Sequence, residues 1–143
     1  MQSKASATWQ GGLKDGKGTI STDSSVLNQT QYSFSTRFEN GKGTNPEELL
    51  AAAHAACFTM ALSNELGTAG MIPTRLNATA IITLEKGPNG FAITKSHIDL
   101  IADIPEVNKA KFEAAVKAAE TGCPVSKLFK AEISVSAKLK EKD

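Results

Sequence analysis

Residues 44–60 are the one long segment of this chain whose pattern is typical of a helix with apolar side chains on nearly every side. Asn45 is a suitable N-cap, Pro46 suits the first helical position, and Glu48 stands three residues after the cap, as in a capping box. The pattern continues to Gly67, a natural C-terminal stop, and predicts a helix of roughly twenty residues and about 30 Å. Because such a helix must be covered on all sides, it is predicted to lie at the centre of the fold.

The size and charge of the chain exclude several classes of protein. It has 143 residues, of which 41% are hydrophobic, so residues 1–143 are predicted to form a single domain with its own core. Its 16 basic and 15 acidic residues are dispersed, whereas nucleic-acid binding draws on clustered Lys and Arg, so no nucleic-acid partner is expected. No signal peptide and no run long enough to span a membrane is evident, so we expect a cytoplasmic protein without a membrane partner.

Three short segments before the helix are rich in β-forming residues: 3–9, 18–22 and 31–38. Turn-forming residues separate these segments, which predicts an antiparallel meander of three strands. The last predicted strand carries Arg37, and a Gly-rich loop then leads into the helix. Arg37 is therefore expected on a strand edge or loop, close in sequence to the start of the helix.

The chain after the helix is predicted to contain three strands and two helices. Residues 75–86 and 91–104 should pair as a long hairpin, because a Gly-Pro-Asn-Gly turn joins them. Residues 106–121 carry apolar side chains at helical spacing, which favours an amphipathic helix lying on a sheet. A short helix is predicted at 123–129 and a strand with one buried face at 131–139.

Two cysteines are the main candidates for chemistry: Cys57 in the long helix and Cys123 at the cap of the short one. Unpaired amides at a helix start favour the thiolate of Cys123, whereas Cys57 needs a cation such as Arg37 for the same effect. Cys57 can equally be an inert core residue, since free cysteine is among the most buried residue types. A zinc site made by both cysteines with His54 and His97 is disfavoured, because no Cys-x-x-Cys spacing is present.

Three motifs stand out: Gly43-Thr-Asn-Pro-Glu-Glu-Leu, Ala53-His-Ala-Ala-Cys-Phe and Gly122-Cys-Pro-Val-Ser. In these motifs the chain resembles the OsmC/Ohr family of thiol peroxidases, most closely its OsmC branch. The resemblance extends over essentially the whole chain. It implies an α+β fold in which antiparallel sheets pack around a long central helix, and an intertwined homodimer. It also implies reduction of organic hydroperoxides, with dithiols or lipoyl-bearing proteins as reductants and with neither a metal nor another cofactor.

The same resemblance assigns roles to four residues. It makes Cys57 the peroxidatic and Cys123 the resolving cysteine, and it gives Arg37 and Glu47 to the same site. Glu48, one place later, would be only a helix-cap residue. In this chemistry a thiolate attacks the peroxide and becomes a sulfenic acid, which the second thiol captures as a disulfide.

Two rival functions remain open from the residues alone. The first is a non-enzymatic stress or binding protein whose cysteines are inert, and the second is a thiol hydrolase that uses Cys57 with His54 as its base. His54 stands one turn before Cys57, although a histidine in such a helix is more often a packing residue.

Helix geometry bears on how the predicted site is assembled. Glu47 and Cys57 are ten residues apart, so on one helix they differ by about 15 Å in height and about 80° in direction. They cannot touch directly. Either Arg37 spans the gap within one chain, or two chains contribute to each site; the small side chains of Ala51–Ala56 would let two such helices pack closely, which favours the second arrangement.

Overall fold

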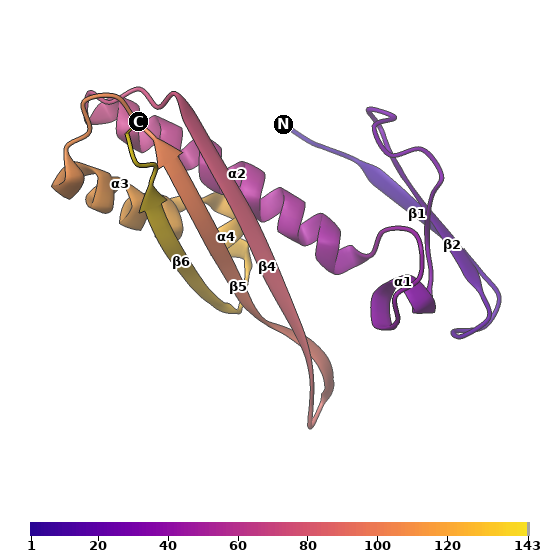
Figure 1. The fold of residues 1–143 in the computed structure, drawn as a ribbon. Coiled ribbons are helices and arrows are strands. Elements are labelled where there is room, and N and C mark those ends of the chain that lie inside the picture. Colours follow the sequence, from indigo (N-terminus) through magenta and orange to yellow (C-terminus); the bar gives the residue numbers. More distant parts are fainter. Residues whose placement is uncertain (143) are drawn as a thin grey trace. The chain divides into compact units, whose positions relative to one another are not determined.

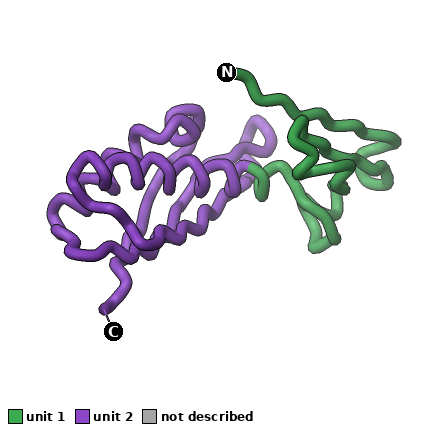
Figure 2. Tube along the Cα trace, turned by 90° about the horizontal axis from the view of Figure 1, so that it is seen from above, with its two compact units in different colours: residues 1–49 green, residues 50–143 purple. Residues whose placement is uncertain are grey.

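The computed structural model describes residues 1–142, which form six strands and four helices (Figure 1). The chain divides into two compact units, one of residues 1–49 and one that begins at Leu50 (Figure 2). Helix α2 (Pro46–Thr68) begins in the first unit and continues into the second. The mixture of helices and antiparallel strand pairs confirms the α+β class, whereas the single domain over 1–143 stays a prediction.

The first unit contains the predicted three-stranded meander. Its strands are β1 (Ala5–Gln10), β2 (Lys17–Thr22) and β3 (Thr30–Tyr32), in the sheet order β1-β2-β3. Both neighbouring pairs are antiparallel.

The third strand is much shorter than predicted, because a helical turn, α1 (Phe34–Phe38), replaces its second half. Ser33 and Thr36 form a capping box: the Thr36 amide donates to the Ser33 hydroxyl at 3.3 Å, and the Ser33 amide donates to the Thr36 hydroxyl at 2.8 Å. The prediction of a strand over 31–38 is therefore confirmed only for its first two residues and is wrong for the rest. Arg37 lies in the last turn of α1 and not on a strand or a mobile loop.

Helix α2 begins where the sequence predicts. The Glu48 amide donates to the Asn45 side chain at 2.7 Å, which confirms Asn45 as the N-cap. In a capping box, the Glu48 carboxylate would accept a hydrogen bond from the backbone amide of Asn45. Here it accepts one from the Thr44 hydroxyl instead, at 2.8 Å. Asn45 also donates to the Thr36 carbonyl at 2.8 Å, which ties the start of α2 to α1.

The end of α2 is a Schellman motif centred on Gly70. The Met71 amide donates to the Leu66 carbonyl at 2.8 Å, and the Gly70 amide donates to the Gly67 carbonyl at 3.0 Å. Gly70 has a φ of +82°, the left-handed conformation that this motif requires. The prediction that Gly67 stops the helix was wrong, since α2 continues to Thr68.

Substitution by alanine is expected to have opposite effects on stability at Gly67 and at Gly70. Gly67→Ala should stabilise the protein by about 1 kcal/mol, because alanine favours a helix and its added methyl group meets no atom within 4 Å. Gly70→Ala should destabilise it by about 1–2 kcal/mol, because an L-residue is strained at positive φ. Urea unfolding of each variant measures both changes, and shifts of the same sign would contradict the assignment.

The second unit is built on a mixed sheet with the order β4-β5-β6. β4 (Arg75–Gly87) and β5 (Gly90–Asp103) form the predicted antiparallel hairpin, and β6 (Glu132–Leu139) pairs with β5 in the parallel direction. The expected antiparallel pattern thus gains one parallel pair. The reason is topological: a parallel pair needs a long crossover, and the chain between β5 and β6 supplies one.

The crossover consists of two helices, α3 (Lys109–Gly122) and α4 (Pro124–Leu128). Asn108 caps α3 by accepting a hydrogen bond from an amide of its first turn. The helix starts later than the predicted residue 106, because Glu106 has a φ of +50° and cannot be helical. α4 forms within the predicted range, with Pro124 at its start.

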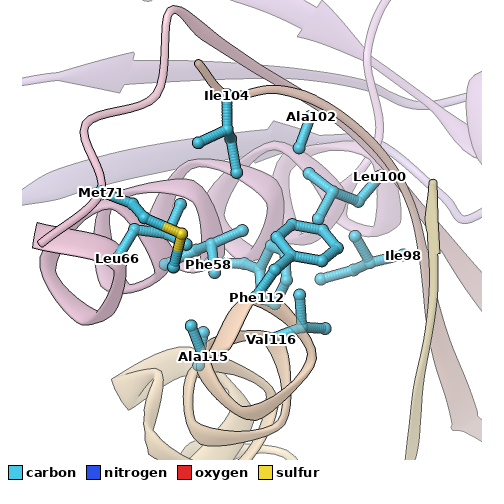
Figure 3. Packing of buried hydrophobic residues seen from close by; sticks show 12 residues of the cluster. Phe58, Leu66, Met71, Ile98, Leu100, Ala102, Ile104, Phe112, Ala115 and Val116 are labelled. Atoms are coloured by element: carbon cyan, nitrogen blue, oxygen red, sulfur yellow. The ribbon is translucent and has the colours of Figure 1, made fainter. Parts of the chain in front are cut away.

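The core of the second unit lies where α2 and α3 cover one face of this sheet (Figures 1 and 3). Side chains from the three elements form one buried cluster that includes Phe58, Leu62, Leu66, Ile98, Leu100, Phe112 and Val116. The buried residues of α2 are His54 and every fourth residue after it, which make a single stripe. The helix is therefore not covered on all sides as predicted, and Met60 remains 77% exposed.

Candidate active site

Cys57 and Cys123 lie together in the second unit, and both thiols are free. Cys57 projects from α2 and is partly exposed, whereas Cys123 has no exposed surface. Burial raises the pKa of the Cys57 thiol, and Cys123 raises it further through a side-chain hydrogen bond and an electrostatic interaction. A hydrogen bond from the Val125 backbone amide acts in the opposite direction. The predicted pair of cysteines is thus brought into contact.

Cys123 holds its position because it is the joint between α3 and α4. Its amide donates to the Ala119 carbonyl at 3.0 Å, and its carbonyl accepts from the Lys127 amide at 3.1 Å. Among the described residues the Cys123 side chain makes no capping hydrogen bond with α4. This differs from the expectation that α4 activates Cys123 locally, since the thiol interacts with Cys57 and the α4 amide of Val125 donates to Cys57 instead.

Arg37 and Glu47 form an ion pair within the first unit. The Arg37 Nε and Nη2 atoms both bind Glu47 Oε1, at 2.9 and 2.8 Å. The guanidinium also stacks on the Phe38 ring, with its carbon 5.3 Å from the ring centre. The Glu47 side chain is only 12% exposed while that of Arg37 is 39% exposed, so the carboxylate is the less accessible member of the pair. Glu48 bonds to Thr44, as suits a helix-cap residue.

A cavity of about 330 Å³ opens beside Arg37 in the first unit. Its walls are mostly apolar and include the side chains of Trp9, Leu13, Tyr32, Phe34 and Phe38. The cavity places one cation next to space that an apolar group can occupy.

His54 is fully buried, and serine hydroxyls occupy both of its ring nitrogens. Nδ1 lies 2.5 Å from the Ser96 hydroxyl and Nε2 lies 2.8 Å from the Ser126 hydroxyl. Burial lowers the pKa of His54, because removal from water disfavours the charged ring. These contacts support the packing interpretation of His54 and give no support to its use as a base for Cys57.

Sequence reasoning missed this histidine–serine network. A signal was available in β5, where Ser96 occupies a core-facing position in an alternation that otherwise places Ile98, Leu100 and Ala102 in the core. A serine at such a position requires a hydrogen-bonding partner, which here is His54.

The residues considered for a zinc site do not assemble. The His97 ring nitrogens lie 2.6 Å from the Ser134 hydroxyl and 3.1 Å from the Asp99 carboxylate. Within residues 1–142, no three His, Cys, Asp or Glu side chains are grouped as metal ligands. No helix in this described part of the chain is long and apolar enough to cross a membrane.

Comparison with known proteins identifies the chain's relatives. A family model described as OsmC-like protein matches residues 39–138. Peroxiredoxin OsmC of Escherichia coli strain K12 is 51% identical over 140 residues, which cover 98% of each chain. The organic hydroperoxide resistance protein OhrB of Bacillus subtilis is 29% identical over 124 residues, or 86% of this chain and 89% of that protein.

Solved structures give the same relationship. The crystal structure of Bacillus subtilis OhrB matches with a TM-score of 0.67 at 28% identity, and covers 96% of this chain and 98% of its own. An organic hydroperoxide resistance protein from Elizabethkingia anophelis matches with a TM-score of 0.71 at 26% identity, over 99% of both chains.

Proposed function

Because this chain belongs to the OsmC family, we propose that it is a thiol peroxidase that reduces organic hydroperoxides to alcohols. The observation that carries the proposal is the contact between the partly exposed Cys57 thiol and the fully buried Cys123 thiol. One sulfur is accessible to a substrate, and the second is placed to capture the oxidised product of the first. The relatives named as a peroxiredoxin and as organic hydroperoxide resistance proteins support the same reaction.

The reaction proceeds in two steps at sulfur. The Cys57 thiolate attacks the distal oxygen of the hydroperoxide, so that an S–O bond forms as the O–O bond breaks and the leaving alkoxide takes a proton to become an alcohol. Cys57 is then a sulfenic acid, oxidised by two electrons. The Cys123 thiol attacks that sulfur, water leaves, and a disulfide forms. An external dithiol or lipoyl-bearing protein returns the two electrons.

Arg37 and Glu47 supply the charge that this reaction needs. Burial raises the pKa of Cys57, so a cation must stabilise the thiolate and the negative charge that develops on the departing oxygen. Arg37 takes this role, and Glu47 orients its guanidinium through the two hydrogen bonds to one carboxylate oxygen.

The substrate carries an apolar tail. Phe58 follows Cys57 in the sequence, but its ring is fully buried in the core and cannot contact a substrate. The apolar cavity beside Arg37 instead supports a substrate with an alkyl or aryl group.

The active protein is an obligate homodimer in which each site draws residues from two chains. Two features of α2 support a dimer: only one stripe of the helix is buried within the chain, and Met60 is exposed. The apolar surface left uncovered on α2 is available to a second copy of the chain. Activity is therefore expected to disappear when the dimer dissociates. Sedimentation at the assay concentration tests this expectation, and a fully active monomer would contradict it.

Incubation of the reduced protein with cumene hydroperoxide tests the function. One equivalent should yield one equivalent of the corresponding alcohol and a Cys57–Cys123 disulfide, located by peptide mass mapping. Protein with both thiols alkylated beforehand is the control and should produce neither. A protein with inert cysteines, or a thiol hydrolase, would leave the peroxide intact and both thiols free, and that result would overturn the proposal.

A further inference from the structure

One imidazole connects three elements of the second unit. His54 projects from α2, Ser96 lies in β5, and Ser126 lies in α4. All three side chains are buried, and the two hydrogen bonds of the ring span from the sheet to α4. A buried polar ring is costly unless it is fully hydrogen-bonded, and both of its nitrogens are.

The imidazole contacts the α4 segment at two points. Besides the hydrogen bond to Ser126, the ring meets Phe129 edge to face, with centres 5.3 Å apart and planes at 81°. Ser126 and Phe129 are three residues apart and thus lie on one side of the turn. His54 therefore fixes both the position and the rotation of α4.

The residue before Ser126 donates a hydrogen bond to Cys57, the candidate nucleophile. Val125 directly precedes Ser126, and its backbone amide hydrogen-bonds to the Cys57 sulfur. Cys123, which contacts the same sulfur, caps the same short helix. A shift of α4 would move both the amide and the second thiol relative to Cys57.

We propose that His54 is a positioning residue that holds α4, through Ser126, where the Val125 amide and the Cys123 thiol meet the Cys57 sulfur. The proposal rests on the proposed function only in giving Cys57 a reaction to perform. The experiments below measure the reactivity of the Cys57 thiol and the NMR signals of the imidazoles, not peroxidase activity. The positioning role of His54 can therefore be refuted in an active peroxidase, and it can be supported in a protein without that activity.

The first experiment removes the α4 end of the link. In Ser126→Ala, the pH profile of Cys57 alkylation by iodoacetamide should move toward acid, because a loosened α4 withdraws the Cys123 thiol, which raises the pKa of Cys57 by more than the Val125 amide lowers it. The rate at high pH, where the thiolate is fully formed, should match that of the unmodified protein. Ser126→Thr keeps the hydroxyl and should restore the original profile.

The chain offers a matched control in its other histidine. Ser134→Ala removes a serine–histidine hydrogen bond of 2.6 Å in the same sheet but does not touch α4, so its alkylation profile should be unchanged. Folding of every variant is checked by circular dichroism. A folded Ser126→Ala protein with the original profile, or an equal shift in Ser134→Ala, would overturn the proposal.

The second experiment needs no substitution, so it also covers the case in which Ser126→Ala fails to fold. The chain contains two histidines, so their imidazole nitrogen signals can be followed by NMR before and after disulfide formation with diamide. The signals of His54 should shift because the new bond pulls on α4, whereas those of His97 should not. Unchanged His54 signals in the fully oxidised protein would refute the link.

Discussion

Cys57→Ser should reduce hydroperoxide turnover to the uncatalysed background, because a serine hydroxyl neither ionises near neutral pH nor forms a sulfenic acid. Cys123→Ser should still consume one equivalent of peroxide and then stop, because Cys57 is oxidised but no second thiol captures it. Single-turnover rates with cumene hydroperoxide measure the first effect, and trapping with dimedone detects the accumulated sulfenic acid. Equal single-turnover rates for Cys57→Ser and the unmodified protein would contradict the assignment.

The Cys123→Ser variant also tests how the Cys123 thiol affects the pKa of Cys57, through the pH dependence of Cys57 alkylation. The Cys123 thiol raises the pKa of Cys57 through a hydrogen bond and an electrostatic interaction, so its removal should lower that pKa. The thiolate of Cys57 then forms at lower pH, and the alkylation profile should move toward acid. A profile that moves toward alkali would show that the contact between the two thiols has the opposite effect.

Arg37→Ala should slow the oxidation of Cys57 by about a hundredfold, the usual effect of removing one group that stabilises transition-state charge. The apparent pKa of Cys57 should rise as well, because the cation that favours the thiolate is lost. Glu48→Ala is the matched control: it removes a neighbouring carboxylate that bonds to Thr44, while the Arg37–Glu47 pair stays intact. An unchanged alkylation profile in Arg37→Ala would contradict the proposed role.

Mixing inactive subunits identifies the chain from which Arg37 acts. Cys57→Ser and Arg37→Ala proteins are unfolded together and refolded. Recovered activity would place Arg37 and Cys57 of one site on different chains, since each mixed dimer would then contain one intact site. Activity that stays at the level of the separate variants would show that Arg37 acts within its own chain.

Local sequence signals predicted most of the elements but not all of their boundaries. The Asn45 cap and the turn between β4 and β5 are set by residues close in sequence, and both were predicted correctly. α1 was missed because the β-forming residues around it outweighed the capping box of Ser33 and Thr36. The parallel pairing of β6 could not be predicted from alternation alone, since a buried strand face has the same pattern in either direction.

The candidate site required information that lies beyond local patterns. Helix periodicity says nothing about which thiols meet, and the contact between Cys57 and Cys123 depends on how α3 and α4 return to α2. The pairing of Arg37 with Glu47 and not with Glu48 was expected only from the family resemblance. The Val125 amide carries no sequence signal, because every residue other than proline has one.

The unequal exposure of the two sulfurs restricts the path by which electrons return to the protein. Once the disulfide has formed, an incoming reductant reaches only the sulfur of Cys57, because that of Cys123 has no exposed surface. The mixed disulfide must therefore form on Cys57, and Cys123 is the leaving group. The hydroperoxide and the reductant then react in turn at the same sulfur, that of Cys57. An excess of either one should therefore compete with the other for access to this sulfur and slow the other's step.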